Sequence, residues 1–349
     1  MDSIIYRRSE KFEPDFDNLL QVLQRKIPSR PVLFEFGINN RLIEKLSGGI
    51  IDPSIKKSQF IQIIKAFANA GYDYATIAGW RTNTLVFPKG EKEQKETHSL
   101  DSGFLITDRD SFEKYNWPDP TIGDYEIYYD LKNDLPDGMK LIASSNGGIF
   151  ENVVDITGLE NLCFMTKLDE ELTTNIFNEV GSRFLKFYEL VAKIETIGAC
   201  IVNDDWGFKN QTFLSPSMLR RWVFPWHKKI VEAIHKAGKP AILHSCGQLK
   251  DVMNDIIFDM KYDAKHSFED EIVPVEDEYE ILGNKISILG GIDMDFLARS
   301  SKEKIFSRSK AILEKGMTAG GYALGSGNSI PEYIPDENYF AMISAVNFI

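Results

Sequence analysis

Short apolar runs recur along the whole chain, and most of them end at a glycine, a proline or a polar cluster. Buried parallel strands have this pattern, because both faces of such strands are covered. Eight runs fit it, and in chain order they are residues 31–36, 72–78, 139–144, 199–203, 240–245, 263–267, 285–289 and 321–324. The pattern therefore predicts eight buried strands.

Amphipathic stretches lie between most of these runs. Residues 54–70 repeat apolar positions at helical spacing, and residues 169–196 form a long amphipathic pattern. Ser215 and Pro216 suit the N-cap and first turn of a helix that ends near Gly238. Further helices are predicted over residues 250–258, 275–282, 301–315 and 336–348. Strands that alternate with helices in this way predict an α/β fold, a (β/α)8 TIM barrel in which residues 1–349 form one domain.

The main competing architecture is a doubly wound open sheet. It needs a glycine-rich phosphate loop after an early strand, and the chain has neither a G-x-G-x-x-G nor a Walker sequence. Residues 80–138 make a long connection between the second and third strands. Because this connection mixes hairpin-like and helical pieces, we expect it to cap the barrel mouth.

Composition narrows the possible partners. The net charge of −12, with no basic cluster, argues against nucleic acid. We expect no membrane partner, because no apolar run reaches the roughly 18 residues that a span needs. The first residues, MDSIIYRRSEKFEPDF, carry charges where a signal peptide needs an apolar stretch, so we expect a cytoplasmic protein.

A His-x-Cys pair closes the strand predicted at 240–245. Strand side chains alternate with a period of two, so His244 and Cys246 share one face. Imidazole and thiolate are ligand types that zinc favours. An isolated pair of this kind is also compatible with a core cysteine beside a hydrogen-bonded histidine.

Polar residues also close the other predicted strands, at the end where barrel active sites are built. Candidates for contacting a substrate are Trp80, Arg81, Asn146, Trp206 and Asn328. Two of them have simple structural explanations, since Trp206 suits packing and Asn328 suits a turn.

Acidic residues and a second histidine complete the set of candidates. Asp204, His266 and Glu269 are the candidate catalytic residues, although His266 also fits a core histidine and Glu269 lies in an acidic run. Asp204 is a better functional candidate than Asp205, because only one of two adjacent carboxylates is needed to cap the following helix. Three protein ligands and an open position are typical of catalytic zinc.

The C-terminal half resembles the uroporphyrinogen decarboxylase superfamily, which contains that decarboxylase and zinc-dependent corrinoid methyltransferases. The resemblance covers roughly residues 199–347, and the matching blocks are residues 203–207, 214–216, 223–225, 238–247, 289–293 and 320–346. Residues 146–150 and 158–162 extend it weakly into the first half. It implies the same (β/α)8 fold.

The chain departs from the decarboxylase branch. That branch carries an R-Q-A-G-R segment after the first strand, whereas this chain has Phe36-Gly-Ile-Asn-Asn-Arg41 with one arginine. The methyltransferase branch carries the His-x-Cys pair seen here. Members that act on coenzyme M usually place another cysteine in the last strand-end loop, where this chain has Asn328. An acidic ligand at the position of Asp204 is similar to what the family uses, and His266 and Glu269 are the reserve candidates.

The resemblance implies a cytoplasmic, zinc-dependent methyltransferase. It would move a methyl group from a small methoxylated or methylated compound to the corrinoid (cobalamin) of a partner protein. One alternative is a metal-free decarboxylase relative that uses Asp204 and Arg81. The other is a non-catalytic barrel that binds a small ligand or a corrinoid.

Overall fold

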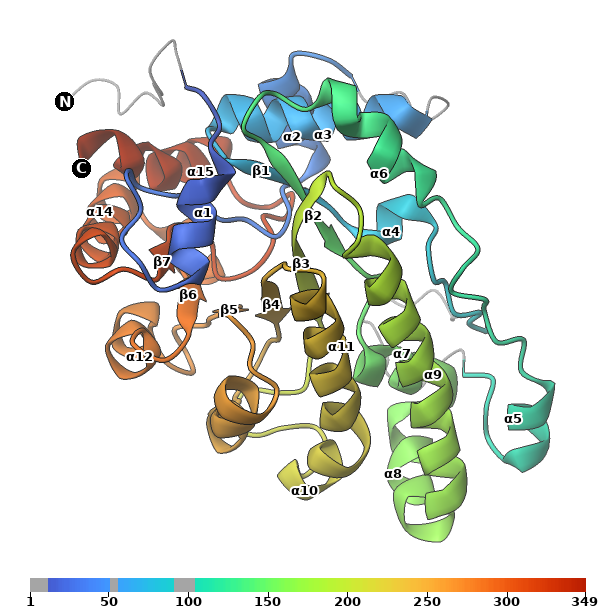
Figure 1. Cartoon of the computed structure of the whole chain (residues 1–349). Coiled ribbons are helices and arrows are strands. Elements are labelled where there is room, and N and C mark those ends of the chain that lie inside the picture. The colour runs from blue at the N-terminus through green and yellow to red at the C-terminus, as the bar shows by residue number, and fades with distance from the viewer. Residues whose placement is uncertain (1–11, 51–55, 91–103) are drawn as a thin grey trace.

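The computed structural model describes residues 12–50, 56–90 and 104–349. Its centre is a curled parallel sheet whose strands follow one another in sequence order, as expected for a TIM-barrel-like fold (Figure 1). The strands are β1 (Tyr74–Ile77), β2 (Lys140–Ser144), β3 (Ile197–Asn203), β4 (Ala241–His244), β5 (Ala264–His266), β6 (Ser287–Leu289) and β7 (Tyr322–Ala323). They coincide with seven of the eight predicted runs, so these seven predictions are confirmed.

The first predicted strand, residues 31–36, is not a regular strand. It joins the end of β7 through an isolated parallel bridge between Leu33 and Leu324. On its other side, the Tyr74 hydroxyl accepts a hydrogen bond from the Glu35 N–H (2.7 Å) and donates one to the Glu35 carbonyl (2.9 Å). A side chain therefore takes the place of the backbone ladder to β1, which corrects the prediction of an eighth strand.

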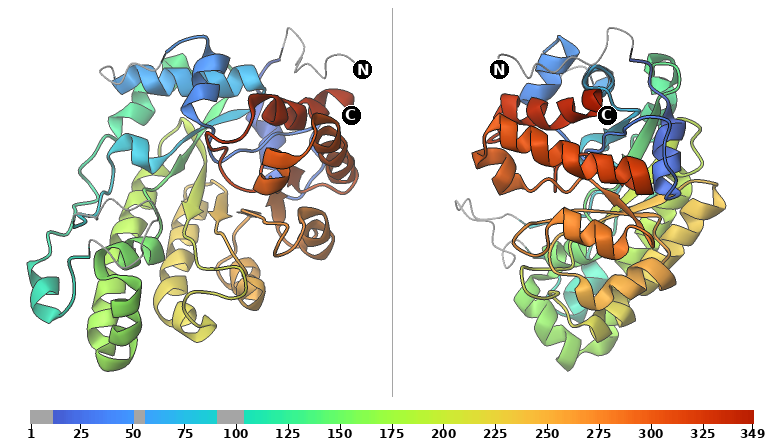
Figure 2. Two further views of the ribbon diagram at one scale, coloured as in Figure 1. Left: turned by 180° about the vertical axis from the view of Figure 1, so that it is seen from behind. Right: turned by 90° about the vertical axis from the view of Figure 1, so that its left-hand side faces the viewer.

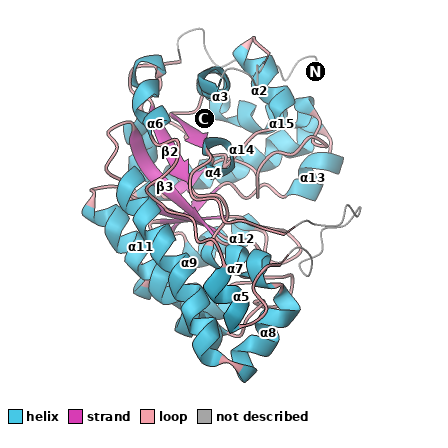
Figure 3. Ribbon diagram, turned by 90° about the vertical axis from the view of Figure 1, so that its right-hand side faces the viewer, coloured by secondary structure: helices cyan, strands magenta, loops and turns pink. Residues whose placement is uncertain are grey.

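Helices surround the sheet (Figures 2 and 3). The α-helices are α1 (Phe16–Leu23), α2 (Asn40–Ser47), α3 (Lys56–Ala70), α4 (Gly79–Thr82), α5 (Arg109–Lys114), α6 (Glu126–Asp130), α7 (Ile149–Thr157), α8 (Leu159–Leu168), α9 (Glu170–Val191), α10 (Pro216–Met218), α11 (Phe224–Lys236), α12 (Val275–Leu282), α13 (Met294–Arg299), α14 (Lys302–Ala319) and α15 (Asp336–Ile343). The 3₁₀ helices are η1 (Leu131–Asp134), η3 (Lys250–Val252) and η5 (Ser344–Phe348), and the π-helical turns are η2 (Leu219–Val223) and η4 (Asp255–Asp259).

The predicted helices are present, three of them in divided form, and the one predicted over residues 336–348 consists of α15 and η5. The helix predicted from Ser215 consists of α10, η2 and α11, and the Ser215 hydroxyl caps it by accepting from the Met218 N–H (3.3 Å). The helix predicted over residues 250–258 consists of η3 and η4. In the described part of the chain, no helix has both the length and the apolar character of a membrane span.

Residues 80–138 were predicted to cap the barrel mouth, and residues 91–103 lie outside the described residues. The described portion after them packs on the outer helices, because Arg109 of α5 forms ion pairs with Asp169 (2.8 Å) and Glu171 (2.7 Å) at the start of α9. Figure 1 shows α5 on the outer side of α8 and α9, away from the sheet. The cap therefore stays a prediction.

Strand register brings polar side chains to one level inside the sheet. Asn203 of β3 pairs with His244 of β4, which pairs with His266 of β5. Paired residues of parallel strands direct their side chains to the same face. That face is the barrel interior, where the two histidine rings meet aromatic rings of the first segment: Phe34 lies 5.2 Å from His266 between ring centroids.

Candidate functional site

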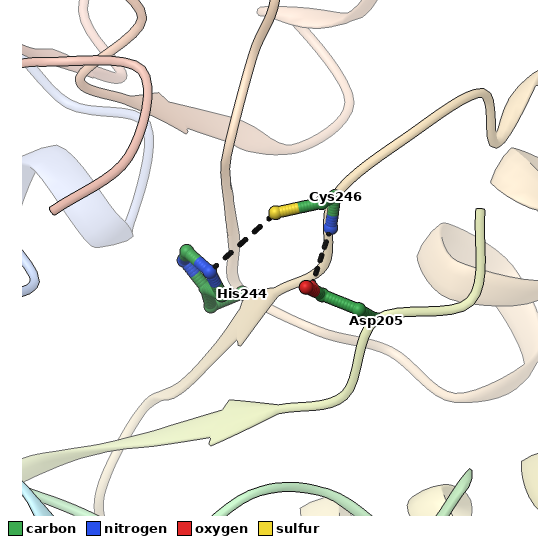
Figure 4. Close-up of side chains that lie close together, drawn as sticks. All are labelled: Asp205, His244 and Cys246. Carbon is green, nitrogen blue, oxygen red and sulfur yellow. Dashed lines mark hydrogen bonds between the residues drawn. The ribbon is translucent and has the colours of Figure 1, made fainter. Parts of the chain in front are cut away.

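Three ligand-type side chains meet just beyond the ends of β3 and β4 (Figure 4). One ligand atom each from Asp205, His244 and Cys246 can be chosen so that all lie within 4.8 Å of one another. His244 Nε2 lies 3.8 Å from Cys246 Sγ, and Asp205 Oδ1 accepts from the Cys246 N–H (2.8 Å). His244 and Cys246 share one face, as strand alternation predicts.

Asp204, the predicted third ligand, is not in this cluster. Its carboxylate is fully buried and accepts from the N–H groups of Phe150 (3.0 Å) and Glu151 (3.1 Å) in the first turn of α7. It also accepts from His227 Nε2 (2.9 Å) on α11. Helix N-termini stabilise carboxylates in this way. The geometry thus corrects the prediction by one residue, and Asp205 is the acid beside the histidine and the cysteine.

Hydrogen bonding defines which nitrogen of His244 is free. His266 Nε2 lies 3.1 Å from the Ser326 carbonyl, so that nitrogen must donate its hydrogen. His266 Nδ1 then accepts from His244 Nδ1 (2.7 Å), and His244 Nε2 keeps its lone pair toward Cys246. Both rings are neutral, because burial lowers the pKa of His244 to about 3 and lowers the pKa of His266 well below its ordinary value. His266, a predicted catalytic residue, lies behind His244 and orients it.

Two polar side chains contact the sulfur of Cys246. Ser267 Oγ lies 3.2 Å from Sγ, and Asn328 Nδ2 donates to it at 3.4 Å. Ser267 has a left-handed backbone (φ +89°), and its carbonyl accepts from Lys265 Nζ (2.5 Å). Burial and the Asp205 carboxylate raise the pKa of the Cys246 thiol. A bound divalent cation reverses this effect, because thiolate is the form that coordinates metal.

Two predicted substrate-contacting residues lie on α4, directly after β1. Trp80 is 51% exposed and meets Phe36 edge to face (5.7 Å between centroids), and Phe36 lies 4.6 Å from the His244 ring. Arg81 donates to Asn40 Oδ1 (3.0 Å), and partial burial lowers the pKa of its guanidinium. Trp80 is therefore linked to the cluster by aromatic contacts, whereas Arg81 is bonded to an asparagine side chain.

Of the remaining predicted residues, Trp206 lies in the core, whereas Asn146 and Glu269 lie nearer the surface. Trp206 is fully buried, 4.8 Å from the His227 ring and 5.0 Å from Phe224, so it packs in the core instead of offering an open platform to a substrate. Asn146 follows β2 and is partly exposed. Glu269 lines a groove of about 840 Å³ together with Asn328. Its charge also raises the pKa of the Cys246 thiol.

Sequence reasoning missed a buried carboxyl group behind the histidine pair. Glu35 Oε1 accepts from the Ser326 N–H (2.7 Å), and Oε2 lies 2.6 Å from Ser326 Oγ. Burial raises the pKa of Glu35 to about 8. Because the Ser326 carbonyl accepts from His266, these groups extend the chain that orients His244. The available signal was a glutamate within an otherwise apolar run.

A second missed pair lies beside the cluster. Asn203 Nδ2 donates to Glu151 Oε2 (3.3 Å), and the same oxygen accepts from the Gly148 N–H (2.8 Å) at the start of α7. Burial and the charges of Asp205 and Asp204 raise the pKa of Glu151 to about 8. The interior next to His244 is therefore rich in hydrogen-bond acceptors.

Comparisons with known proteins match this chain to one family and to two methyltransferases. The family model described as uroporphyrinogen decarboxylase (URO-D) matches residues 105–348, a region that contains the whole cluster. A methylated-thiol–coenzyme M methyltransferase of Methanosarcina mazei is 27% identical over 197 residues, which are 56% of this chain. The chain spans about half the length (51%) of that curated relative. A solved methyltransferase from Methanosarcina mazei superposes with a TM-score of 0.70 at 14% identity, covering 95% of this chain and 97% of the other.

Proposed function

The chain belongs to the uroporphyrinogen decarboxylase family, and within it we propose that the chain acts as a zinc-dependent methyltransferase. Its methyl donor is a small methoxylated or methylated compound, and its acceptor is the corrinoid of a partner protein. The methyltransferase relatives of Methanosarcina mazei support this proposal at the level of the reaction class. The cluster of Asp205, His244 and Cys246 is the observation that carries it.

The three side chains fit a zinc ion in type and number. His244 offers an unprotonated Nε2, Cys246 a sulfur and Asp205 a carboxylate oxygen, all within 4.8 Å of one another. Zinc in catalytic sites takes three such ligands and leaves one position open. The hydrogen bond from His244 Nδ1 to His266 is the kind of support that zinc-bound histidines have.

Bound at these residues, zinc would polarise the methyl-bearing heteroatom as a Lewis acid, which makes that atom a better leaving group. The protein's own groups tune this effect. Asn328 and Ser267 contact the Cys246 sulfur, and hydrogen bonds to a thiolate reduce the charge that it gives to the metal. Asn328 also stands where members that act on coenzyme M usually place a second cysteine, so Cys246 is the single thiolate of this ligand set. The ligand set therefore favours activation of a weakly basic atom such as an ether oxygen.

The decarboxylase alternative has less support. Decarboxylation of a polycarboxylate tetrapyrrole needs cations around the substrate. Among the described residues beside the cluster, Asp205 and Glu151 are acidic, and Arg81 donates to Asn40. These groups disfavour a highly anionic substrate.

Metal analysis and methyl transfer together test the proposal. Purified protein should hold about one zinc per chain. Cys246→Ala should weaken zinc binding at least about 100-fold, whereas Cys163→Ala, which changes an exposed cysteine, should leave it unchanged. Zinc-loaded protein mixed with methoxylated compounds and a reduced corrinoid protein should change the corrinoid absorption spectrum. Failure to bind zinc, or conversion of uroporphyrinogen without methyl transfer from any donor, would contradict the proposal.

A further inference from the structure

Asn203 is the last residue of β3 and carries an unused acceptor inside the barrel. Its side chain points to the same face as that of His244, its partner in the parallel register. It is only 7% exposed, and its Oδ1 has no hydrogen-bond partner, although Nδ2 donates to Glu151. A buried polar atom without a partner destabilises a protein, so it calls for a physical explanation.

The orientation of this amide is fixed by its neighbours. Glu151 Oε2 already accepts from the Gly148 N–H (2.8 Å), so in the neutral acid Oε2 is the carbonyl oxygen and Oε1 carries the proton, which leaves a second lone pair of Oε2 for Asn203. Only the NH2 group of Asn203 can donate a hydrogen bond to that lone pair, and its Nδ2 lies 3.3 Å from Oε2. Rotating the amide by 180° would bring two acceptors together. Asn203 Oδ1 therefore points away from Glu151, and Glu151 is a positioning residue for it.

We propose that Asn203 Oδ1 binds the methyl donor, and that this donor carries a hydroxyl or N–H group next to its methyl-bearing heteroatom. This inference rests on the proposed function. Neighbouring strands lie about 4.8 Å apart, so a heteroatom bound at a metal on His244 has its adjacent substituents within reach of Asn203. An acceptor can be satisfied only by a donor, which excludes a plain ether or an anion at this position.

The carboxyl groups nearby favour the same class of ligand. Asp205 lies two residues beyond Asn203 and so on the same face of the chain, and Glu151 Oε2 accepts from Asn203 Nδ2 (3.3 Å). Oxygen acceptors gathered in this way favour a ligand that donates hydrogen bonds over free carboxylates and phosphates, which can only accept them. The expected donor is therefore a neutral or cationic molecule, such as an aromatic ring with neighbouring hydroxyl and methoxy groups.

Calorimetric titration of the zinc-loaded protein with two probes tests this assignment. 2-Methoxyphenol has the required hydroxyl, and 1,2-dimethoxybenzene has a methoxy group in its place. Wild-type protein should bind 2-methoxyphenol at least about tenfold more tightly, because the second probe leaves Asn203 Oδ1 without a partner. Asn203→Leu, which keeps the branched shape of the side chain but removes its polar atoms, should bind both probes equally while retaining zinc. Asn284→Leu changes an exposed asparagine between α12 and β6 and should keep the preference.

The outcomes separate this inference from the proposed function. Equal affinities of the wild-type protein for the two probes would overturn the inference. A bound water would then be the hydrogen-bond donor to Asn203 Oδ1. A preference that persists in Asn203→Leu, or no binding of either probe, would overturn it as well. If the preference is present but no methyl group reaches a corrinoid protein, the proposed function fails and the Asn203 contact stands.

Discussion

Replacement of Glu35 by glutamine should stabilise the protein, and the gain should grow as the pH rises. Glu35 is fully buried, and burial raises its pKa from the ordinary 4.5 to about 8 against the opposing effect of two hydrogen bonds with Ser326. A neutral Glu35 can accept from the Ser326 N–H and donate to Ser326 Oγ. Glutamine reproduces both bonds through its oxygen and its NH2 group without carrying a titrating proton.

The size of the effect follows from linkage between protonation and folding. A carboxyl group whose pKa is raised by folding contributes stability that is full below pH 4.5 and is lost as the pH rises through about 8. Each pH unit in that interval corresponds to about 1.4 kcal/mol. Glu35→Gln should therefore raise the free energy of unfolding by about 3 kcal/mol at pH 7, with little change near pH 4.5.

Urea denaturation of wild type and variant between pH 4.5 and 8.5 measures this difference. Other titrating groups are common to both proteins, so they cancel when the two profiles are subtracted. Glu113→Gln, which changes an exposed glutamate of α5, is the matched control and should give a flat difference. A flat difference for Glu35→Gln, or equal destabilisation at every pH, would refute the reasoning from burial.

Four further substitutions test other parts of the structure. Asp204→Ala should cost about 3–5 kcal/mol in urea denaturation but leave zinc binding intact, whereas Asp205→Ala should lose zinc with a smaller stability change; the reverse pattern would return Asp204 to the metal site. Asn328→Cys should bind zinc more tightly in competition with a chelator and transfer methyl groups more slowly. Gly325→Ala should lower the unfolding temperature by several degrees, because its Cβ would lie 1.6 Å from the Phe34 carbonyl oxygen.

Most of the fold could be predicted because parallel strands buried on both faces are short, apolar and bounded by turn residues. The exception is instructive. Residues 31–36 have the same apolar pattern, yet only Leu33 pairs with the sheet, at Leu324. The hydroxyl of Tyr74 occupies the backbone groups of Glu35 that a ladder to β1 would use. A tertiary contact between a tyrosine and a distant peptide group leaves no periodic signal in the sequence.

The candidate site shows the same division between local pattern and tertiary register. Alternation correctly requires Asp204 and Asp205 to face opposite ways, but it does not say which one faces inward. That depends on the pairing of Asn203 with His244, which directs Asn203 inward and so favours Asp205 for the interior. The N-terminus of α7 then takes Asp204. Neither the register nor the position of that helix end can be read from one strand alone.

Asn328 illustrates how one departure from a family pattern can be chemically useful. The resemblance places a cysteine ligand at this position in members that act on coenzyme M, and here the asparagine donates to the sulfur of Cys246 at 3.4 Å. An asparagine at this position therefore lowers the negative charge given to the metal in two ways. It removes a thiolate that would give charge to the metal, and it withdraws charge from the thiolate that stays. Ser267, at 3.2 Å from the same sulfur, adds to the second effect. A zinc ion held by Asp205, His244 and Cys246 would consequently be a stronger Lewis acid than one with two thiolates, which suits cleavage of a bond from a methyl group to oxygen.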